Sequence, residues 1–195
     1  MRLPILIALI VTLGQGDIER AQQIARGSEA ERARFHGQYF FMPGDATFTE
    51  LEVTTEFRRA VLLTEDHLRR GDWLFSQSVR SAEQALQPTR GLVSFRARVR
   101  FNPLNAYVTV PPYMLGIGGD SATGRLLPIE TQTTPQYSAS FKSQAGTGTA
   151  LLGAILTADL MAAALGQSAR PVGVLLDGRE IGRVTVDFRQ LDRSP

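Results

Sequence analysis

Three arginines at alternate positions, Arg96, Arg98 and Arg100, form the most suggestive chemical pattern in this chain of 195 residues. Side chains along a β-strand alternate between its two faces. The pattern therefore predicts a strand over residues 93–101, with the arginines on one face and a buried apolar face made by Val93, Phe95, Ala97, Val99 and Phe101. Planar guanidinium groups bind carboxylates and phosphates through two parallel hydrogen bonds. An anionic glycan, a lipid head group or the carboxylates of a partner protein are therefore candidate ligands of this row.

The same row has a structural interpretation, as one half of a cross-strand charge ladder. Alternate strand positions are about 6.7 Å apart, and two like charges at that distance repel by roughly 2.5 kcal/mol at an effective dielectric constant near 20. A half-buried row of arginines therefore needs carboxylate partners. The candidates on other predicted strand segments are Glu50, Glu52, Glu180 and Asp187. We favour the ladder and keep the anion-binding surface as the alternative.

Patterns typical of catalysis or metal binding are sparse. His36 and His67 are the only two histidines, and neither lies at a metal-ligand spacing from a second ligand. The segment 119–124 lacks the Gly-x-Ser-x-Gly spacing of a nucleophile elbow, and the glycine-rich segments 116–119 and 146–148 do not match a phosphate-binding loop. We therefore expect no metal site, no cofactor and no catalytic set.

An alternative is a hydrolase whose carboxylates come from distant positions, because such pairs assemble only in the folded chain. The residues that would have to converge in one pocket are Asp120, Glu130, Asp159 or either histidine. Their dispersal over the surface would favour a non-catalytic module.

Composition narrows the class of protein. The hydrophobic fraction of 43% and the charged fraction of 21% are ordinary for a globular domain. The formal net charge is only +2, so a dedicated nucleic-acid-binding protein is not expected. The chain has no cysteine, which excludes disulfides and thiolate chemistry, and its length allows a core that needs no such staple.

The first 16 residues have the layout of a secretory signal peptide. Arg2 precedes the 11-residue apolar run 3–13, and Gly14 and Gly16 are small residues at the −3 and −1 positions of a cleavage site after Gly16. A helix of that length would cover about 16 Å, roughly half of a bilayer core. We therefore expect export to the periplasm or the medium, without a transmembrane anchor after processing.

Helices are predicted early in the mature chain. Residues 17–34 are polar and read as a solvated helical or flexible lead-in. A helix is predicted from Thr54 or Thr55 to residue 70, because apolar residues recur with helical spacing after a capping threonine, and a second covers residues 79–86. Four arginines lie off the apolar stripe of the first helix and are expected to be solvated: Arg58, Arg59, Arg69 and Arg70. Trp73 and Phe75 are expected to pack the helices onto a sheet.

The rest of the chain predicts strands. Residues 35–42 and 46–53 read as a hairpin around a Pro-Gly-Asp turn. Further strands are predicted at 107–110, 126–133, 137–142 and 150–160, with a glycine-rich loop at 113–124 and a helical turn at 161–165. The last two segments, 172–176 and 181–188, form a hairpin around Asp177-Gly178.

Together these segments predict a strand-dominated α+β fold, a β-sandwich-like antiparallel domain over residues 35–195 with one or two helices packed on a sheet. The leading functional interpretation is an exported, non-catalytic binding or structural module of a bacterial envelope. Arg96, Arg98 and Arg100 are its candidate anion- or partner-binding residues, and the alternative is the exported hydrolase.

Overall fold

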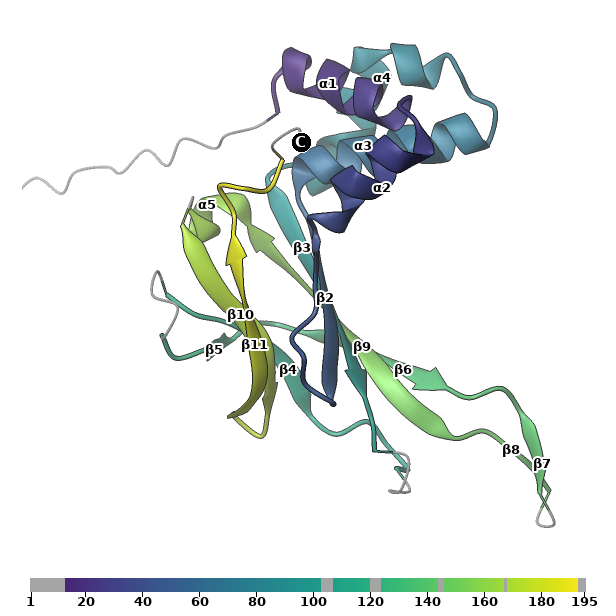
Figure 1. Cartoon of the computed structure of the whole chain (residues 1–195), viewed down its shortest axis with the longest axis vertical. Coiled ribbons are helices and arrows are strands. Elements are labelled where there is room, and N and C mark those ends of the chain that lie inside the picture. Colours follow the sequence, from purple (N-terminus) through teal and green to yellow (C-terminus); the bar gives the residue numbers. More distant parts are fainter. Residues whose placement is uncertain (1–12, 103–106, 120–123, 144–145, 167, 193–195) are drawn as a thin grey trace, which may run out of the picture.

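The computed structural model describes residues 13–102, 107–119, 124–143, 146–166 and 168–192. Two antiparallel sheets face each other, and helices gather at one end of them (Figure 1). The predicted strand-dominated α+β fold is confirmed.

The larger sheet has five strands in the order β1-β2-β3-β9-β6, and all neighbouring pairs are antiparallel. Its strands are β1 (Phe40–Phe41), β2 (Phe48–Thr54), β3 (Leu92–Arg100), β9 (Leu151–Met161) and β6 (Gln132–Tyr137). β3 lies at the centre and alternates between buried and exposed residues as predicted, because its apolar side chains face the second sheet.

The second sheet has the order β11-β10-β4-β5. Its strands are β11 (Arg179–Asp187), β10 (Ala169–Leu176), β4 (Tyr113–Ile117) and β5 (Leu127–Pro128). The hairpin between β10 and β11 is confirmed, and its turn residues Asp177 and Gly178 both have positive φ, 50° and 73°. Two such residues in succession match a type I′ turn, whose twist suits a two-residue hairpin.

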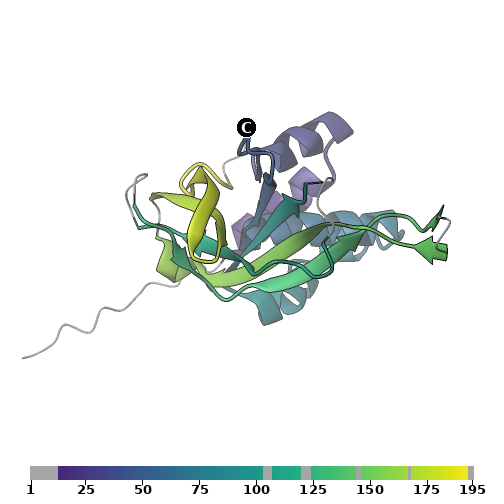
Figure 2. The ribbon, with the colours of Figure 1, turned by 90° about the horizontal axis from the view of Figure 1, so that it is seen from below.

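A two-stranded ribbon, β7 (Phe141–Ser143) and β8 (Gly146–Gly148), continues β6 and β9 beyond the sheet. Figure 2 shows this ribbon projecting away from the rest of the molecule. The ribbon therefore forms an arm at the end of the sheet opposite to the helices (Figure 1).

The helical end contains α1 (Gln15–Ala25), α2 (Glu29–Gly37), α3 (Glu56–Arg69) and α4 (Val79–Leu86). Short 3-10 turns follow at Phe75–Gln77 and Gln87–Thr89, and α5 (Ala162–Leu165) is a single turn after β9. Both predicted helices are present, and the side chain of Thr55 caps α3 by accepting a hydrogen bond from the Arg58 amide at 3.1 Å. A capping threonine stabilises the first helical turn, which explains why the sequence predicted the start of α3 correctly.

One hydrophobic core joins the helices to both sheets. Phe35 of α2 and Phe57 of α3 meet edge to face at 5.9 Å, and both belong to the cluster that includes the inner faces of the strands. In the sheets the cluster continues through Leu51, Val99, Leu156, Leu115, Val172 and Val186. The helices therefore complete the end of the core.

The segment predicted as a first strand, residues 35–42, is only partly a strand. Residues 35–37 belong to α2, and only Phe40 and Phe41 pair with β2. The cause is a capping box, in which the Ser28 side chain accepts from the Glu31 amide at 3.3 Å while the Glu31 carboxylate accepts from the Ser28 amide at 2.7 Å. This box starts a helix at Glu29, inside the segment 17–34 that was interpreted as a solvated helical or flexible lead-in.

The strand after β3 also differs from the prediction. Residues 107–110 form no strand, and Val108 is 92% exposed. β4 instead uses residues 113–117, from the segment that was read as a glycine-rich loop. Gly116 suits the interior of β4, because an added Cβ there would lie 3.0 Å from Leu175 Cδ1 and 3.1 Å from Leu126 Cβ, a tight fit that would require these neighbours to shift.

α1 is more than a solvated lead-in. It buries Ile18, Ala21 and Ala25, which are at most 2% exposed. It begins at Gln15, so a cleavage after Gly16 falls inside its first turn. No helix within the described residues is long and apolar enough to cross a membrane.

Candidate functional site: the arginine face of the larger sheet

The three arginines share the outward face of the five-stranded sheet, called here the arginine face. The register places Glu52 and Thr157 on either side of Arg96, and Glu50 and Ile155 on either side of Arg98. The arginines of β3 are exposed, whereas the intervening apolar residues are buried. β3 and its two neighbouring strands therefore hold the three arginines in a fixed order on one exposed face of the larger sheet.

The carboxylates of β2 compensate this row unevenly. Arg96 Nη1 lies 3.4 Å from Glu52 Oε2, and Arg98 Nη2 lies 3.9 Å from Glu50 Oε1. Arg100 makes no ion pair and no side-chain hydrogen bond with any other residue that the structure describes. The predicted ladder is present for two of the three rungs, and the positive charge is least compensated at the Arg100 end.

The other two predicted carboxylates do not reach the row. Glu180 pairs with Arg183 within β11, and Asp187 Oδ1 lies 3.2 Å from Arg189 Nε. Both belong to the second sheet or its end, so the ladder is limited to the partners that β2 supplies. Sequence alone could not distinguish these carboxylates, because all four lie on strand segments.

Arg58 is an important residue that the sequence pattern misplaced. It is 2% exposed, its Nη2 donates to Glu52 Oε1 at 2.8 Å, and its Nη1 donates to the Val53 carbonyl oxygen at 2.6 Å. Its guanidinium also lies over the ring of Tyr39, 4.8 Å from the centroid. Burial lowers the pKa of Arg58, and the adjacent Glu52 carboxylate opposes that shift. Glu52 is therefore shared between a buried arginine and the exposed row.

Arg59 is also partly withdrawn from solvent. Its Nη2 donates to Ser94 Oγ at 2.7 Å, and its Nη1 donates to the carbonyl oxygens of Thr89 and Leu92 at 3.3 and 3.2 Å. Burial lowers the pKa of this guanidinium as well. Of the four arginines expected in solvent, only Arg69 and Arg70 are there, each with 73% of its side chain exposed.

A hollow of about 380 Å³ lies at the Arg100 end of the row. Its lining includes polar and apolar side chains, contributed by β2, β3, β6 and β9: Thr49, Arg98, Arg100, Gln136, Leu151 and Leu152. The register explains the position of the hollow, because Gly153 lies between Arg100 on one side and Gln136 on the other. This central position carries no side chain.

Gly153 is required by close backbone packing. A Cβ at this position would lie 2.2 Å from the Val99 carbonyl oxygen, a distance that no real side chain adopts. The absence of a side chain between Arg100 and Gln136 is therefore a consequence of how β3 and β9 approach each other.

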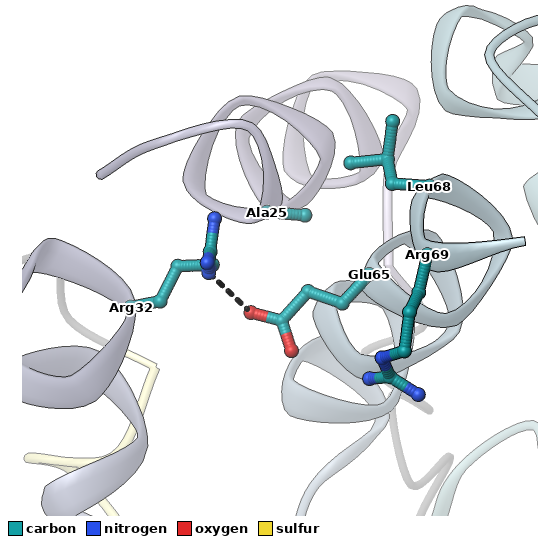
Figure 3. Close-up of a pocket in the computed structure, with 5 residues that line it drawn as sticks. All are labelled: Ala25, Arg32, Glu65, Leu68 and Arg69. Atoms are coloured by element: carbon teal, nitrogen blue, oxygen red, sulfur yellow. Dashed lines mark ion pairs between the residues drawn. The ribbon is translucent and has the colours of Figure 1, made fainter. Parts of the chain in front are cut away.

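Both histidines lie in the helical end, away from the arginine face. His36 Nε2 lies 3.0 Å from Glu65 Oε1 and links α2 to α3, while His67 Nδ1 lies 2.9 Å from Asp72 Oδ2. Figure 3 shows Glu65 with Arg32, 3.6 Å away, at a hollow between the first three helices. The contact of His36 holds α2 and α3 together, and the contact of His67 joins the end of α3 to the turn that follows it. The placement of His36 on a strand was wrong, because the helix capped by Ser28 includes it.

The expected role of Trp73 and Phe75 is only partly met. Phe75 stacks on His67 with ring centroids 3.6 Å apart, so it does pack against α3. Trp73 is 63% exposed and Leu74 is 82% exposed. The prediction that Trp73 packs the helices onto a sheet was wrong, because the turn after Gly71 directs this segment outward.

Two of the carboxylates that a hydrolase would need to converge border the same hollow. Glu130 and Asp159 line a common hollow of about 230 Å³ with Gln132 and Thr157, and both are exposed. Asp120 lies outside the described residues, and the histidines are elsewhere. Across the described part of the chain, no three His, Asp or Glu side chains gather into a group that could hold a metal ion.

No protein-family model, no curated protein and no solved structure matches the chain. Functional inference therefore depends on the chemistry of the surfaces themselves.

Proposed function

We propose that this chain is an exported, non-catalytic binding module of a bacterial envelope, in the periplasm or outside the cell, that binds an anionic partner through the arginine face. The supporting observation is the excess of arginines over carboxylates at the Arg100 end of the arginine face, away from Asp159, which the register pairs with Ser94 near the other end of β3. Three exposed arginines face Glu50 and Glu52, and Glu52 is already bonded to the buried Arg58. An acidic glycan, an anionic lipid surface or the carboxylates of a protein supply the missing negative charge.

Rigid strands suit such a role. Arg98 lies on a strand paired on both sides, with β2 and with β9, and the pairing with β2 shifts register between Phe48 and Glu50, so its backbone is held by two neighbours. Arginine also suits binding, because its planar guanidinium holds a carboxylate or phosphate in a defined orientation.

The test is a charge-matched comparison of two triple variants. Replacing Arg96, Arg98 and Arg100 by Gln is expected to lower the salt concentration at which the protein elutes from heparin and to reduce its retention on anionic liposomes, because exposed charge interactions are strongest at low salt. The control replaces three exposed arginines elsewhere by Gln: Arg69, Arg70 and Arg179. Equal losses in the two variants would contradict a specific arginine face.

Export is tested separately, by the N-terminal sequence of the protein recovered from periplasm, medium and cytosol. The proposal predicts a mature chain that starts at residue 17 and has lost the apolar run 3–13. Such cleavage shortens α1 by two residues and leaves the buried Ile18 and Ala21 in place. Recovery of the intact chain with Met1 from the cytosol alone would contradict export.

A second candidate, an exported hydrolase, is supported by the shared hollow of Glu130 and Asp159. Paired carboxylates can divide the acid and base roles of glycoside hydrolysis. However, a carboxyl that acts as a general acid near neutral pH is typically shielded from water, and both of these are exposed. Hydrolysis of chromogenic glycosides that is lost in both Glu130→Gln and Asp159→Asn would favour the enzyme over the module.

A further inference from the structure

The hollow at the Arg100 end of the row combines features that the rest of the arginine face lacks. Arg96 is matched by Glu52 at 3.4 Å and Arg98 is loosely matched by Glu50 at 3.9 Å, while Arg100 has no such partner among the described residues. The surplus of positive charge is therefore concentrated between Arg98 and Arg100. It is not spread evenly along the three positions.

The spacing of these two arginines suits one anionic group. Alternate strand positions are about 6.7 Å apart, and a charge-assisted hydrogen bond from guanidinium to oxygen is roughly 2.8 Å long. A single carboxylate or phosphate located between the two guanidinium groups can therefore accept hydrogen bonds from both. Its negative charge also removes the repulsion between them.

The opposite wall supplies neutral contacts. Gln136 is Gly153's partner in β6, so its amide lies across the empty position from Arg100. An amide can donate a hydrogen bond to an anion or accept one from a hydroxyl group. The missing side chain at Gly153 leaves the space between the amide and the guanidinium open, as the lining of the hollow indicates.

The apolar part of the lining combines core and exposed residues: Val99 and Phe101 belong to the core and Leu151 packs against it, whereas Leu152 lies outside it. Leu152 is 49% exposed, and Leu151, which also lines the hollow, pairs with Tyr137, which is 59% exposed. Exposed apolar surface next to a polar rim is typical of binding sites. The charged side and the apolar side of the hollow thus lie within one space of about 380 Å³, large enough for part of a small ligand.

We propose that this hollow binds an amphiphilic anion, with a carboxylate or phosphate head between Arg98 and Arg100 and an apolar portion against Leu151 and Leu152. The inference depends on the proposed function, since it names the chemistry of the partner at that same face. This inference is more specific than the proposed function. The arginine face as a whole suits any polyanion, whereas the hollow suits one charged group attached to a short hydrocarbon.

The experiment is calorimetric titration of the full chain with octyl phosphate and with octanoate. Inorganic phosphate and octanol are the control ligands, the first with the charged head alone and the second with the apolar chain but no charge. Octyl phosphate, octanoate or both are expected to bind at least about tenfold more tightly than either half alone, because the charged and apolar contacts are made together. Preference between the two anions tells whether the site accepts phosphate or carboxylate heads.

Three single variants locate the binding. Arg100→Gln is expected to weaken binding of the amphiphile by about tenfold or more, since hydrogen bonds to charged groups are the stronger class. Leu152→Ser is expected to weaken binding of the amphiphile and to leave binding of inorganic phosphate unchanged. Arg179→Gln removes one exposed arginine from the second sheet and is expected to change nothing.

Two outcomes would overturn the inference. One is binding of both amphiphiles no tighter than inorganic phosphate, and the other is an equal loss in Arg100→Gln and Arg179→Gln. If heparin retention still depends on the three arginines in that case, the binding module stands and only the amphiphilic ligand is excluded. If heparin retention also fails to depend on them, both proposals fail.

Discussion

The helical end and the arginine face hold charged residues in opposite ways. At the helical end Arg58 is 2% exposed and donates to Glu52 and to a carbonyl oxygen at 2.8 and 2.6 Å. On the arginine face Arg100 is exposed and has no ion-pair partner among the described residues. A buried charge must be paired because desolvation is costly, whereas an exposed one is free to bind something else. The contrast separates an arginine that stabilises the fold from arginines available for a ligand.

Glu52 joins the two regions. Its Oε1 accepts from Arg58 at 2.8 Å, and its Oε2 lies 3.4 Å from Arg96 Nη1. The same carboxylate therefore anchors α3 to β2 and forms the first rung of the exposed ladder. Substitutions on either side of Glu52 distinguish the two roles.

The largest effect is expected for Arg58→Met. This change removes the guanidinium from between Glu52, the Val53 carbonyl oxygen and the Tyr39 ring, and leaves two acceptors without their donor. We expect the free energy of unfolding in urea to fall by about 3–5 kcal/mol. The control is Arg69→Met, on the exposed side of α3, which should change it by less than about 0.5 kcal/mol. Similar losses in both variants would contradict the contrast.

An intermediate effect is expected for Glu52→Gln. The amide can still accept a hydrogen bond from Arg58, but the buried guanidinium loses its counter-charge. We expect a loss of about 1–3 kcal/mol in the free energy of unfolding. Glu50→Gln is the matched control, because its contact with Arg98 is longer, 3.9 Å, and more exposed. A larger loss for Glu50→Gln would place the structural role in the ladder.

A pH dependence is expected at the helical end, from Asp192. Its carboxylate accepts hydrogen bonds from Tyr39 Oη at 2.6 Å and Thr55 Oγ1 at 2.5 Å, and burial raises its pKa despite those bonds and the nearby Arg20. Burial likewise raises the pKa of Tyr39. The folded protein therefore binds the Asp192 proton more strongly than the unfolded chain does, in which the pKa of Asp is about 3.9. As a result, the contribution of Asp192 to stability falls as pH rises from about 4 through the pKa of the folded state.

Urea unfolding of wild type and Asp192→Asn across this pH range measures the effect. As pH rises, the free energy of unfolding of Asp192→Asn should increase relative to that of the wild type. Asn keeps an oxygen that can accept from Tyr39 and Thr55, so gross loss of packing is not expected. A difference that stays constant with pH would contradict a raised pKa at Asp192.

The smallest effect on stability is expected for the triple replacement of Arg96, Arg98 and Arg100 by Gln. Exposed ion pairs contribute little, and the loss of two of them is offset by the removal of repulsion along the row. We expect the free energy of unfolding to change by less than about 1 kcal/mol while anion retention falls. A large destabilisation would mean that the row is chiefly structural.

Local patterns in the sequence were sufficient for several elements. The alternation of residues 93–101 predicts β3, because period-2 burial needs no knowledge of the neighbouring strands. The helix from residue 56 to 69 follows from its cap and its apolar stripe, and the terminal hairpin follows from Asp177-Gly178. The capping box of Ser28 and Glu31 was equally local and would have predicted α2.

Tertiary structure alone decided which charged residues are buried and which meet. Arg58 and Arg69 lie on one helix and look alike in sequence, yet only the arginine that faces β2 is buried. The register of β3 and β9 places Gly153 beside Arg100, although 53 positions separate them in the chain. Which partners lie opposite a strand depends on pairing between distant segments, and a shift of one residue would reverse every face. The arginine row was therefore visible in the sequence, whereas its missing counter-charge and the hollow beside it appear only in the fold.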